Sequence, residues 1–528
     1  MLASGSASVI VTLTKAAGHL AEAVLRPART VGARLMIGLG WRDGRHLGYA
    51  GCVRTLLRPA LLLGLALLPA PLPAQTPPDL TVYPYPRPVK YTPGDLMRDP
   101  HHNGDFTVRV RASGGDWQDL YEHNVKVDWN DPQNASMVAF DFRGKAEISV
   151  QKNNGLFSKV RIRPNPEGIE PVINGNTVHF TIGRPQNLSV EFDSDSKHNL
   201  HIFAGLPYAQ RPEGLNVVYF GPGVHKPENG AEAFTARSGQ TVYIDGGAVL
   251  DGAFVLESVH DVAIIGHGII EQPKGGFLIK HSSNIRVEGL TFINPAHGTL
   301  ACRQSQHVVL SSIKTFSAVP WGDGINIYSC EDVSLDKAFI RTSDDCFTVY
   351  GHRDDTYGDA RHIRVSNSVF WADTAHAMFL GMHGNTEKPE TIEDVVFKNI
   401  DVLDLREDQP DYQGVMAIYA GDGNLVRNIT FEDIRVDHIE EGKLFNFRVG
   451  YNSKYNSGPG RGIENITLRN IAFTGQGTVG ASVIEGYDQA HSVRHIEIEN
   501  LRIDGQKLTE PAHGVLEIGH YADGVTFR

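Results

Sequence analysis

The sequence predicts an all-β protein in which a right-handed parallel β-helix follows an antiparallel β-sandwich. Three features support this prediction. A short strand pattern recurs through residues 206–528, apolar residues alternate with polar ones in residues 79–205, and no helical periodicity separates the repeats. Repeats of this length, built only from short strands, are typical of solenoids in which each coil buries its apolar side chains against neighbouring coils.

A leader comprising residues 1–74 precedes both domains. In its last part, about residues 53–74, Arg54 and Arg58 come before an apolar run and a small-residue exit, an order typical of a secretory signal peptide. The apolar run is too short for a membrane span, which needs about 20 apolar residues. We therefore predict a secreted or periplasmic protein that has no membrane contact once the signal is removed.

Residues 79–205 carry the sandwich pattern. Segments such as DFTVRVRA, NTVHFTI and NLSVEFD alternate between polar and apolar side chains and are separated by Gly, Asn and Pro turns. This alternation predicts strands with one buried face. We expect a separate antiparallel domain that packs against the first coils of the β-helix.

Residues 206–528 carry a repeated signal, a polar residue followed by an apolar, any and an apolar residue. Successive copies lie 23 to 37 residues apart, and the spacing grows after residue 332. Longer loops on one side of a solenoid leave the stacked strands intact and can build a cleft. The polar residues of the nine copies are Asp261, Asn284, His307, Asp332, His362, Asp394, Asn428, Asn465 and His495.

Net charge and cysteine content restrict the possible partners. The chain carries a formal charge of −12, and removing the leader, with eight basic and two acidic residues, leaves −18. An acidic surface of this size repels nucleic acid. Cys52 belongs to the leader, and the odd remainder, Cys302, Cys330 and Cys346, has no short paired spacing. We therefore predict buried small side chains rather than a disulfide framework.

Three successive coils align through their apolar residues. WGDGINIY from Trp321 matches SDDCFTVYG from Ser343 at a shift of 22 residues, and TAHAMFLG from Thr374 follows at a further 31. Asp323, Asp345 and His376 then share one file along the stack, with Asp344 beside it. Stacked strands lie about 4.8 Å apart, so the alignment predicts a cluster of three carboxylates and one imidazole.

Carboxylates this close repel one another, and one of them takes a proton unless the site stays fully solvated. A single residue type can thereby supply both an acid and a base. Asp344 and Asp345 can face one cleft only if they lie at a turn, because consecutive strand residues point to opposite faces. The alternative is that the Ser-Asp-Asp sequence merely caps a loop. The register with Asp323 and His376 favours catalysis.

These residues resemble the polygalacturonase family, glycoside hydrolase family 28, whose motifs are Asn-Thr-Asp, Gly/Asp-Asp-Asp and Gly-His-Gly. Asp323 matches the first motif, Asp344 and Asp345 the second, and His376 the third. The sandwich, from VRIRPNPEG onwards, resembles the N-terminal domain of family 49, the dextranases and isopullulanases.

The resemblance implies an inverting hydrolase of α-glycosidic bonds in a polysaccharide. Asp344 would be the general acid, while Asp323 and Asp345 would hold the attacking water. His376 would tune the ionisation of Asp345 or orient the sugar. For this mechanism we expect the acid and the base to lie about 6.5–9.5 Å apart.

Departures from the family pattern bear on the substrate. Ala375 and Ala377 replace the glycines beside the histidine, and Trp321-Gly322 replaces Asn-Thr. The Arg-Ile-Lys motif that binds a uronate carboxylate is absent from the coil after His376, which reads GVMAIYAGDG. Its absence removes charge-assisted hydrogen bonds to galacturonate. A neutral α-glucan is therefore favoured, with polygalacturonate as the alternative, and Arg303 and Arg448 keep that alternative open.

Several other residues are candidates for contacts with substrate. Trp321, Tyr419 and Tyr451 offer sugar-stacking rings, although aromatic residues at coil corners also serve packing. We predict no metal and no cofactor, because the sequence shows no group of ligand residues at a spacing typical of metal sites. We also expect a monomer. The full substrate-binding set is His297, Arg303, Trp321, Asp373, His383, Tyr419, Arg448, Tyr451 and Lys454.

Two other functions compete with hydrolysis. A polysaccharide lyase on this fold would use a basic residue as its base and usually calcium, and no Arg or Lys adjoins the aspartates in sequence. A non-catalytic glycan-binding β-helix is the second competitor, because a fold alone does not confer chemistry.

Overall fold

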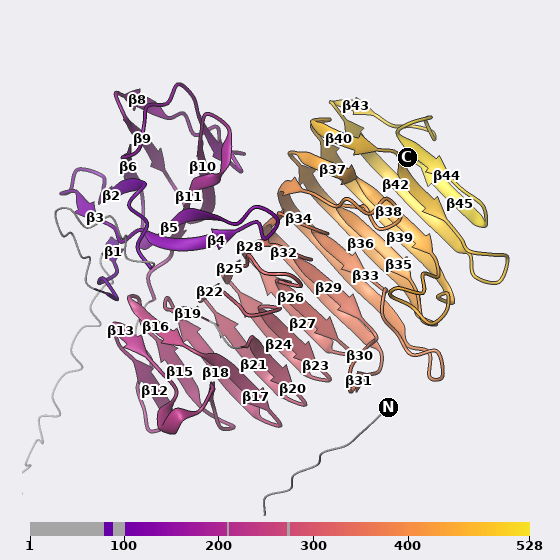
Figure 1. The fold of residues 1–528 in the computed structure, drawn as a ribbon, viewed down its shortest axis with the longest axis horizontal. Coiled ribbons are helices and arrows are strands. Elements are labelled where there is room, and N and C mark those ends of the chain that lie inside the picture. Colours follow the sequence, from indigo (N-terminus) through magenta and orange to yellow (C-terminus); the bar gives the residue numbers. More distant parts are fainter. Residues whose placement is uncertain (1–78, 88–100, 209–210, 272–274) are drawn as a thin grey trace, which may run out of the picture. The chain divides into compact units, whose positions relative to one another are not determined.

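The computed structural model describes residues 79–87, 101–208, 211–271 and 275–528 (Figure 1). The predicted leader with its signal peptide and Cys52 lies outside these ranges. Every regular element in the described ranges is a strand, apart from one 3-10 turn at Glu228–Gly230. No helix among the described residues is long and apolar enough to cross a membrane. The prediction of an all-β fold is confirmed.

The sandwich consists of two sheets around one apolar core. Val108 and Ile148 from one sheet and Val138 and Leu188 from the other are fully buried in a common cluster. All strand pairs in the two sheets are antiparallel except β5 with β11, which run parallel. The first sheet contains β1 (Leu80–Val82), β5 (Gln133–Phe142), β11 (Asp195–Gly205), β10 (Gln186–Phe192) and β7 (Val160–Arg163), with β4 (His123–Val127) on β5; the second contains β3 (Gln118–Asp119), β2 (Phe106–Ala112), β6 (Ala146–Lys152), β9 (Thr177–Ile182) and β8 (Val172–Asn174).

Each coil of the β-helix contributes strands to three columns, here called files, in which strands of successive coils pair in parallel. Figure 1 shows the successive coils side by side. The third file forms a sheet of its own, and the first two merge into single long strands from β32 onwards. The first file is β12 (Val217–Phe220), β15 (Thr241–Ile244), β18 (His260–Gly266), β21 (Ser283–Glu288), β24 (Gln306–Ser311) and β27 (Glu331–Asp336); the second is β13 (Gly223–His225), β16 (Ala248–Asp251), β19 (Ile269–Glu271), β22 (Thr291–Ile293), β25 (Lys314–Phe316) and β28 (Phe339–Thr342).

The merged strands and the third file complete the solenoid. The merged strands are β32 (Ala360–Ala372), β34 (Thr391–Leu405), β36 (Leu425–Val436), β39 (Gly462–Phe473), β42 (Val493–Ile503) and β45 (Ala522–Phe527). The third file is β14 (Ala233–Thr235), β17 (Ala253–Glu257), β20 (Phe277–Lys280), β23 (Leu300–Arg303), β26 (Ile325–Tyr328), β29 (Phe347–Tyr350), β33 (Met378–Leu380), β35 (Met416–Ala420), β38 (Phe445–Val449), β41 (Ser482–Glu485) and β44 (Leu516–Ile518). Small side pairs are β30 (His352–Arg353) with β31 (Thr356–Tyr357), β37 (Ile439–Lys443) with β40 (Gly477–Gly480), and β43 (Gln506–Lys507) on β42.

The nine polar repeat residues mark one turn of each coil. All nine have φ between 54° and 58°, the left-handed region that Asn and Asp tolerate best. Their side chains bond along the stack: Asn284 donates to Asp261 at 2.9 Å, and Asn465 donates to Asn428 at 3.0 Å. The next residue in each copy is apolar and buried in the core. The repeat in the sequence therefore indicates a residue with left-handed backbone conformation as well as a strand.

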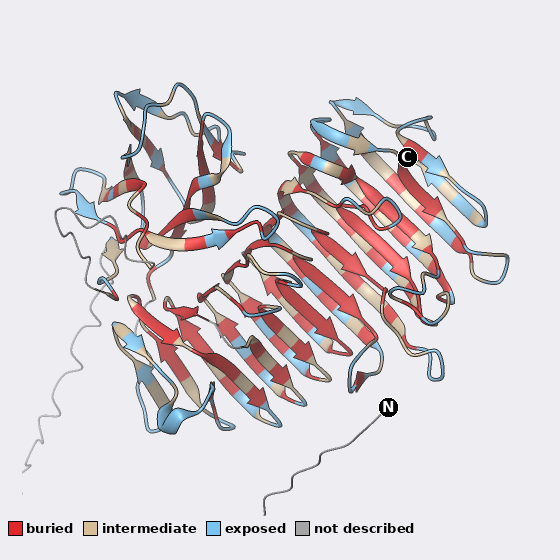
Figure 2. Cartoon of the chain, viewed as in Figure 1, coloured by how far each residue is buried: buried red, intermediate tan, exposed pale blue. Residues whose placement is uncertain are grey.

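The sandwich lies against a long stretch of the solenoid. Val127 and Phe203 of the sandwich share an apolar cluster with residues from successive coils, running from Val249 in β16 to Leu403 in β34. Figure 2 shows buried positions along both partners. The contact therefore extends well beyond the first coils, on which the sandwich was expected to pack. The apolar outer face of the sandwich covers seven successive strands of the second file, from β16 to β34.

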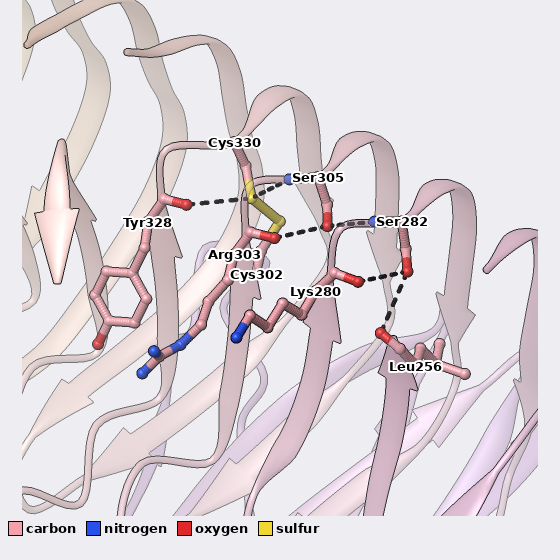
Figure 3. Close-up of a disulfide and its surroundings, with 8 residues drawn as sticks. All are labelled: Leu256, Lys280, Ser282, Cys302, Arg303, Ser305, Tyr328 and Cys330. Carbon is pink, nitrogen blue, oxygen red and sulfur yellow. Dashed lines mark hydrogen bonds between the residues drawn. A yellow bond between two sulfur atoms is a disulfide. The ribbon is translucent and has the colours of Figure 1, made fainter. Parts of the chain in front are cut away.

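One disulfide joins two neighbouring coils. Cys302 in β23 is bonded to Cys330, which follows β26, with the Cα atoms 6.5 Å apart (Figure 3). The prediction of no disulfide is wrong for this pair, because coil stacking brings together residues that are distant in sequence. Serines occupy the same turn in earlier coils: the backbone N–H of Ser305 donates to Cys330 Sγ, and that of Ser282 donates to Ser305 Oγ. Cys346 is buried and free, as predicted.

Candidate active site

A cleft of about 930 Å³ runs across the third file, and the predicted catalytic residues lie in its wall. Strands β20, β23, β26 and β29 form its floor, and loops that follow β32, β34 and β38 form one side. Loops lengthen at these coils, as the growing repeat spacing predicts. The catalytic candidates that line it are Asp323, Asp344, Asp345 and His376.

Asp323, Asp345 and His376 occupy equivalent positions in three successive coils. Each stands two residues before a strand of the third file, β26, β29 or β33. The register pairs Ile325 with Phe347, and β29 with β33 at the predicted offset. The alignment drawn from the sequence is thus confirmed. Because the strands on either side are locked by their apolar residues, the three polar side chains are held in file.

Asp344 and Asp345 lie in the bend between β28 and β29, which lets both face the cleft. An oxygen of each of Asp323, Asp344 and Asp345 lies within 4.8 Å of an oxygen of the other two. Asn326 Nδ2 donates to Asp323 at 2.9 Å, and the hydroxyl of Tyr350 donates to Asp345 at 3.2 Å. The bend predicted from the adjacent aspartates is present, and neighbouring side chains fix the orientation of two carboxylates.

Burial and mutual repulsion shift the protonation of two of the carboxyl groups. Burial, followed by the charge of Asp345, raises the pKa of Asp323 to about 7. Burial and the charges of Asp323 and Asp345 raise the pKa of Asp344 well above its ordinary value. A carboxyl group that keeps its proton near neutrality can donate it to a leaving oxygen. The site therefore contains an acid and a carboxylate at the same time.

His376 forms a buried ion pair with Asp345. Its Nδ1 lies 2.6 Å from Asp345 Oδ1, and its Nε2 contacts the backbone oxygen of Tyr412. Burial alone would lower the pKa of His376, but the Asp345 carboxylate outweighs burial and raises it to about 9. Because a carbonyl oxygen only accepts, Nε2 carries a proton, and the raised pKa keeps a second proton on Nδ1 near neutral pH. Phe379 stacks on the ring at 4.1 Å and holds its plane.

The family model of Glycosyl hydrolases family 28 matches residues 223–516, which is more than half of the chain. The chain belongs to this family. It is a glycoside hydrolase, and the resemblance noted in its sequence is confirmed. The non-catalytic alternative is thereby disfavoured.

Individual relatives of this family 28 chain are distant. A probable polygalacturonase from Arabidopsis thaliana is 22% identical over 165 residues, which cover 30% of this chain and 32% of the relative. The chain thus matches only about a third of that relative's length. Dex49A from Penicillium minioluteum superimposes with a TM-score of 0.58 at 14% identity, covering 85% of this chain and 96% of Dex49A. A family 28 exopolygalacturonase from Yersinia enterocolitica gives 0.48 at 13% identity, covering 73% and 93%. The likeness to Dex49A concerns the fold alone.

Five of the nine residues predicted to bind substrate in this family 28 enzyme do line the cleft. Trp321 is 67% exposed and stacks beside His297, with ring centroids 6.1 Å apart. The guanidinium of Arg303 is paired with Asp354 at 3.0 Å. The remaining two are His383 and Lys454.

The structure does not bring the other four to the cleft. Asp373 forms a buried ion pair with Arg341 at 2.9 Å, beneath the sandwich. Tyr419 is buried against a neighbouring tyrosine, with ring centroids 4.8 Å apart. Arg448 is bound to Asp411 at 2.7 Å on a later coil. Tyr451 is exposed, but away from the lining. Coil register alone placed them near the site, but Asp373 and Tyr419 are buried elsewhere and Arg448 is held by its ion pair.

Sequence reasoning missed several residues of the cleft wall. Arg353 follows β29, and its guanidinium lies 3.3 Å from His383 Nε2. Burial and then the charge of Arg353 lower the pKa of His383 to about 4, so this ring is neutral and accepts the bond. Asn326 and Tyr350 alternate with inward apolar residues in β26 and β29, a signal that marks outward positions. Trp129 belongs to the sandwich, and no local signal could place it here.

Among the residues that the structure describes, two clusters bring ligand atoms close enough to hold a cation. One is the catalytic aspartate trio, and the other comprises Glu331, Asp332 and His362 on the polar turns. In the second cluster His362 Nδ1 already pairs with Asp332 at 3.2 Å. The absence of a metal requirement stays a prediction, which chelation before assay would test.

Proposed function

We propose that this protein is a secreted inverting hydrolase of α-glycosidic bonds in a polysaccharide. The observation that supports this role is the aspartate trio in the wall of the cleft. Asp344, with its raised pKa, would protonate the glycosidic oxygen. Asp323 and Asp345 would hold the water that attacks the anomeric carbon. His376 would act as a positioning residue, because its charge stabilises the carboxylate of Asp345.

The spacing of the trio suits a shared water. Hydrogen bonds between water and carboxylate are about 2.7–2.8 Å long. Two oxygens within 4.8 Å of each other can therefore accept both protons of one water molecule. A water held by two acceptors presents its lone pair in one direction. This supports Asp323 and Asp345 as the pair that orients the nucleophile.

Inversion is the finer part of the proposal. The rule that inverting enzymes separate their carboxyl groups by about 6.5–9.5 Å gains no support here, because the nearest oxygens lie within 4.8 Å. Support comes instead from the family resemblance and from the shared water, which needs a second carboxylate as a water ligand rather than as a nucleophile. The stereochemistry of the product decides between the two routes.

A neutral α-glucan is the substrate class we propose first. Two arginines that could have bound the carboxylate of a uronate already form ion pairs within the protein. Arg303 is paired with Asp354 and Arg448 with Asp411. The strand that follows β33 in the third file, β35, presents Ala417 and a buried tyrosine where family 28 would carry its clamp. A neutral sugar needs no cation at this position.

Polygalacturonate is the second candidate, and Arg353 favours it. This guanidinium lines the cleft, and among the described residues it has no carboxylate partner within ion-pair distance. An unpaired arginine beside a sugar site can bind a carboxylate through two parallel hydrogen bonds. The polygalacturonase relative from Arabidopsis thaliana is consistent with this candidate.

A substrate screen tests the proposal. Purified protein is incubated with dextran, pullulan, nigeran and polygalacturonate, and new reducing ends are measured, with Asp344→Asn as the control. We expect reducing ends from a neutral glucan and none from the variant. Release only from polygalacturonate would replace the first candidate with the second. Absorbance near 235 nm would reveal an unsaturated lyase product. Activity that survives in Asp344→Asn would contradict the assigned acid.

A further inference from the structure

A loop of the sandwich reaches the catalytic cleft. Residues 128–132 connect β4 and β5, and two of them, Trp129 and Asn130, line the cleft together with the aspartate trio. The backbone N–H of Trp129 donates to Ser343 Oγ at 3.0 Å, and Asn130 Nδ2 donates to Thr374 Oγ1 at 2.9 Å. The loop is therefore bonded to the residue before Asp344 and to a residue of the coil that carries His376.

The loop is fixed from both sides, so its position is part of the fold. Asp128 adopts φ of 54°, and its Oδ1 accepts the backbone N–H groups of Asn130 and Asp131. Its Oδ2 is paired with Lys197 of β11 at 2.7 Å. On the other side, the backbone N–H of Asp128 donates to Asp373 at 3.2 Å. The carboxylate of Asp373 is itself held by the buried Arg341.

Trp129 is the part of this loop that can meet a ligand. Its side chain is 38% exposed at the cleft, and among the described residues no aromatic ring or cation covers it. Trp117 of the same domain offers a comparison, because it is 37% exposed but carries the guanidinium of Arg111 over its ring at 4.5 Å. A bare indole in a polar cleft has a flat apolar face, which matches the C–H face of a pyranose ring.

We propose that Trp129 and Trp321 form a sugar-binding subsite of which the sandwich supplies one half. The ligand is a sugar unit of the same polysaccharide chain, away from the bond that is cleaved. Trp321 contributes the other ring from the coil of Asp323 and is 67% exposed. The inference rests on the proposed function, since it requires a glycan in the cleft. It assigns the sandwich a role in substrate recognition in addition to packing.

Equilibrium binding tests the subsite without relying on turnover. The protein carries Asp344→Asn, and the probes are size-fractionated isomalto-oligosaccharides and oligogalacturonates, titrated by calorimetry. We expect Trp129→Ala to weaken binding of long oligosaccharides about fivefold to tenfold, the change that a loss of about 1.0–1.4 kcal/mol produces. Binding of the shortest fragments should not change. Trp129→Phe should restore most of the affinity, because it restores an aromatic face.

Trp117→Ala is the matched control, with equal exposure in the same domain, and it should bind like the parent. The backbone bond from residue 129 to Ser343 persists in Trp129→Ala, so its melting temperature should equal that of the parent protein. Equal affinity of Trp129→Ala and its parent for long oligosaccharides would overturn the subsite while leaving the hydrolase assignment intact. Equal weakening for short and long fragments would also overturn it, because it would indicate a distorted catalytic bend. Failure of both probe series to bind would contradict the subsite and the proposed function together.

Discussion

His376 and Asp345 form an ion pair that is almost completely shielded from solvent, with Nδ1 and Oδ1 2.6 Å apart. The opposite ring nitrogen donates to a backbone carbonyl, which fixes the orientation of the ring. Of the three carboxylates, only Asp345 has a cation as its immediate neighbour among the described residues. The ion pair thus breaks the symmetry of the trio and allows one member to be a base while another is an acid.

Replacing His376 by Gln should lower kcat about a hundredfold, the order found when one preorganised donor is removed from an active site. KM should change little, because the ring is almost fully buried and acts through Asp345. In the parent enzyme the ion pair is lost as the pH rises through about 9, so this alkaline transition should be absent from the kcat profile of the variant. His495→Gln, on a distant turn, is the control. An unchanged profile would show that His376 only fills space.

Asp344→Asn should lower kcat about 10³-fold or more, since general acid catalysis contributes roughly 10²–10⁴-fold. The amide has nearly the same shape but donates no proton, so KM should stay within about twofold. Initial rates on the substrate found in the screen give both constants. A rise in KM with little change in kcat would reassign Asp344 to binding.

Asp323 should make the native state less stable as the pH rises from about 4 towards 7. Its pKa is raised by burial from 3.8 to about 7, so over this interval the native state binds more protons than the unfolded state. Asp323→Asn removes this loss. Its melting temperature should equal that of the parent near pH 4 and exceed it at about pH 8. Asp116→Asn, an exposed site in the sandwich, should show no such difference.

The first product of an α-linked substrate should be the β-anomer. In the proposed mechanism, water held by Asp323 and Asp345 would attack from the face opposite to the bond that Asp344 protonates, which would invert the anomeric centre. Proton NMR of a fresh digest distinguishes the anomers before mutarotation. The α-anomer as first product would require a covalent glycosyl intermediate on one of the aspartates.

Arg353→Gln should move the acidic limb of the rate profile to higher pH. The Arg353 cation opposes the larger effects of burial and Asp345 on the pKa of Asp323, so its loss should raise that pKa. On a neutral glucan kcat/KM should otherwise change less than about threefold, a surface-charge effect of the usual size. Arg303→Gln is the comparison, since that charge is already paired. A loss confined to polygalacturonate would establish Arg353 as a uronate ligand.

The alignment of Asp323, Asp345 and His376 could be predicted because it depends on apolar residues that lie close to each of them in the sequence. The apolar residues of each coil fix the register, and the aspartates stand at a constant offset from them. The same reasoning failed for Asp373 and Tyr419, whose burial depends on the sandwich and on neighbouring rings. The coil repeat carries no information about those contacts.

Long-range packing also explains what was missed. Trp129 reaches the cleft only because the sandwich docks across many coils, and no pattern around it encodes that docking. The disulfide between Cys302 and Cys330 was not predicted for a related reason. The spacing rule for small disulfide-rich domains does not apply to cysteines on stacked coils.

The apolar contact between the two domains also bears on the order in which the chain acquires its structure. Phe203 must wait for Leu403 to leave the ribosome before the cluster that contains both can close. Closure over so long an intervening chain is slow. Docking of the sandwich also delivers the bonds to Ser343 and Thr374 beside the aspartates. In refolding, catalytic competence should therefore appear after the coils themselves have formed, with the N-terminal domain completing the site last.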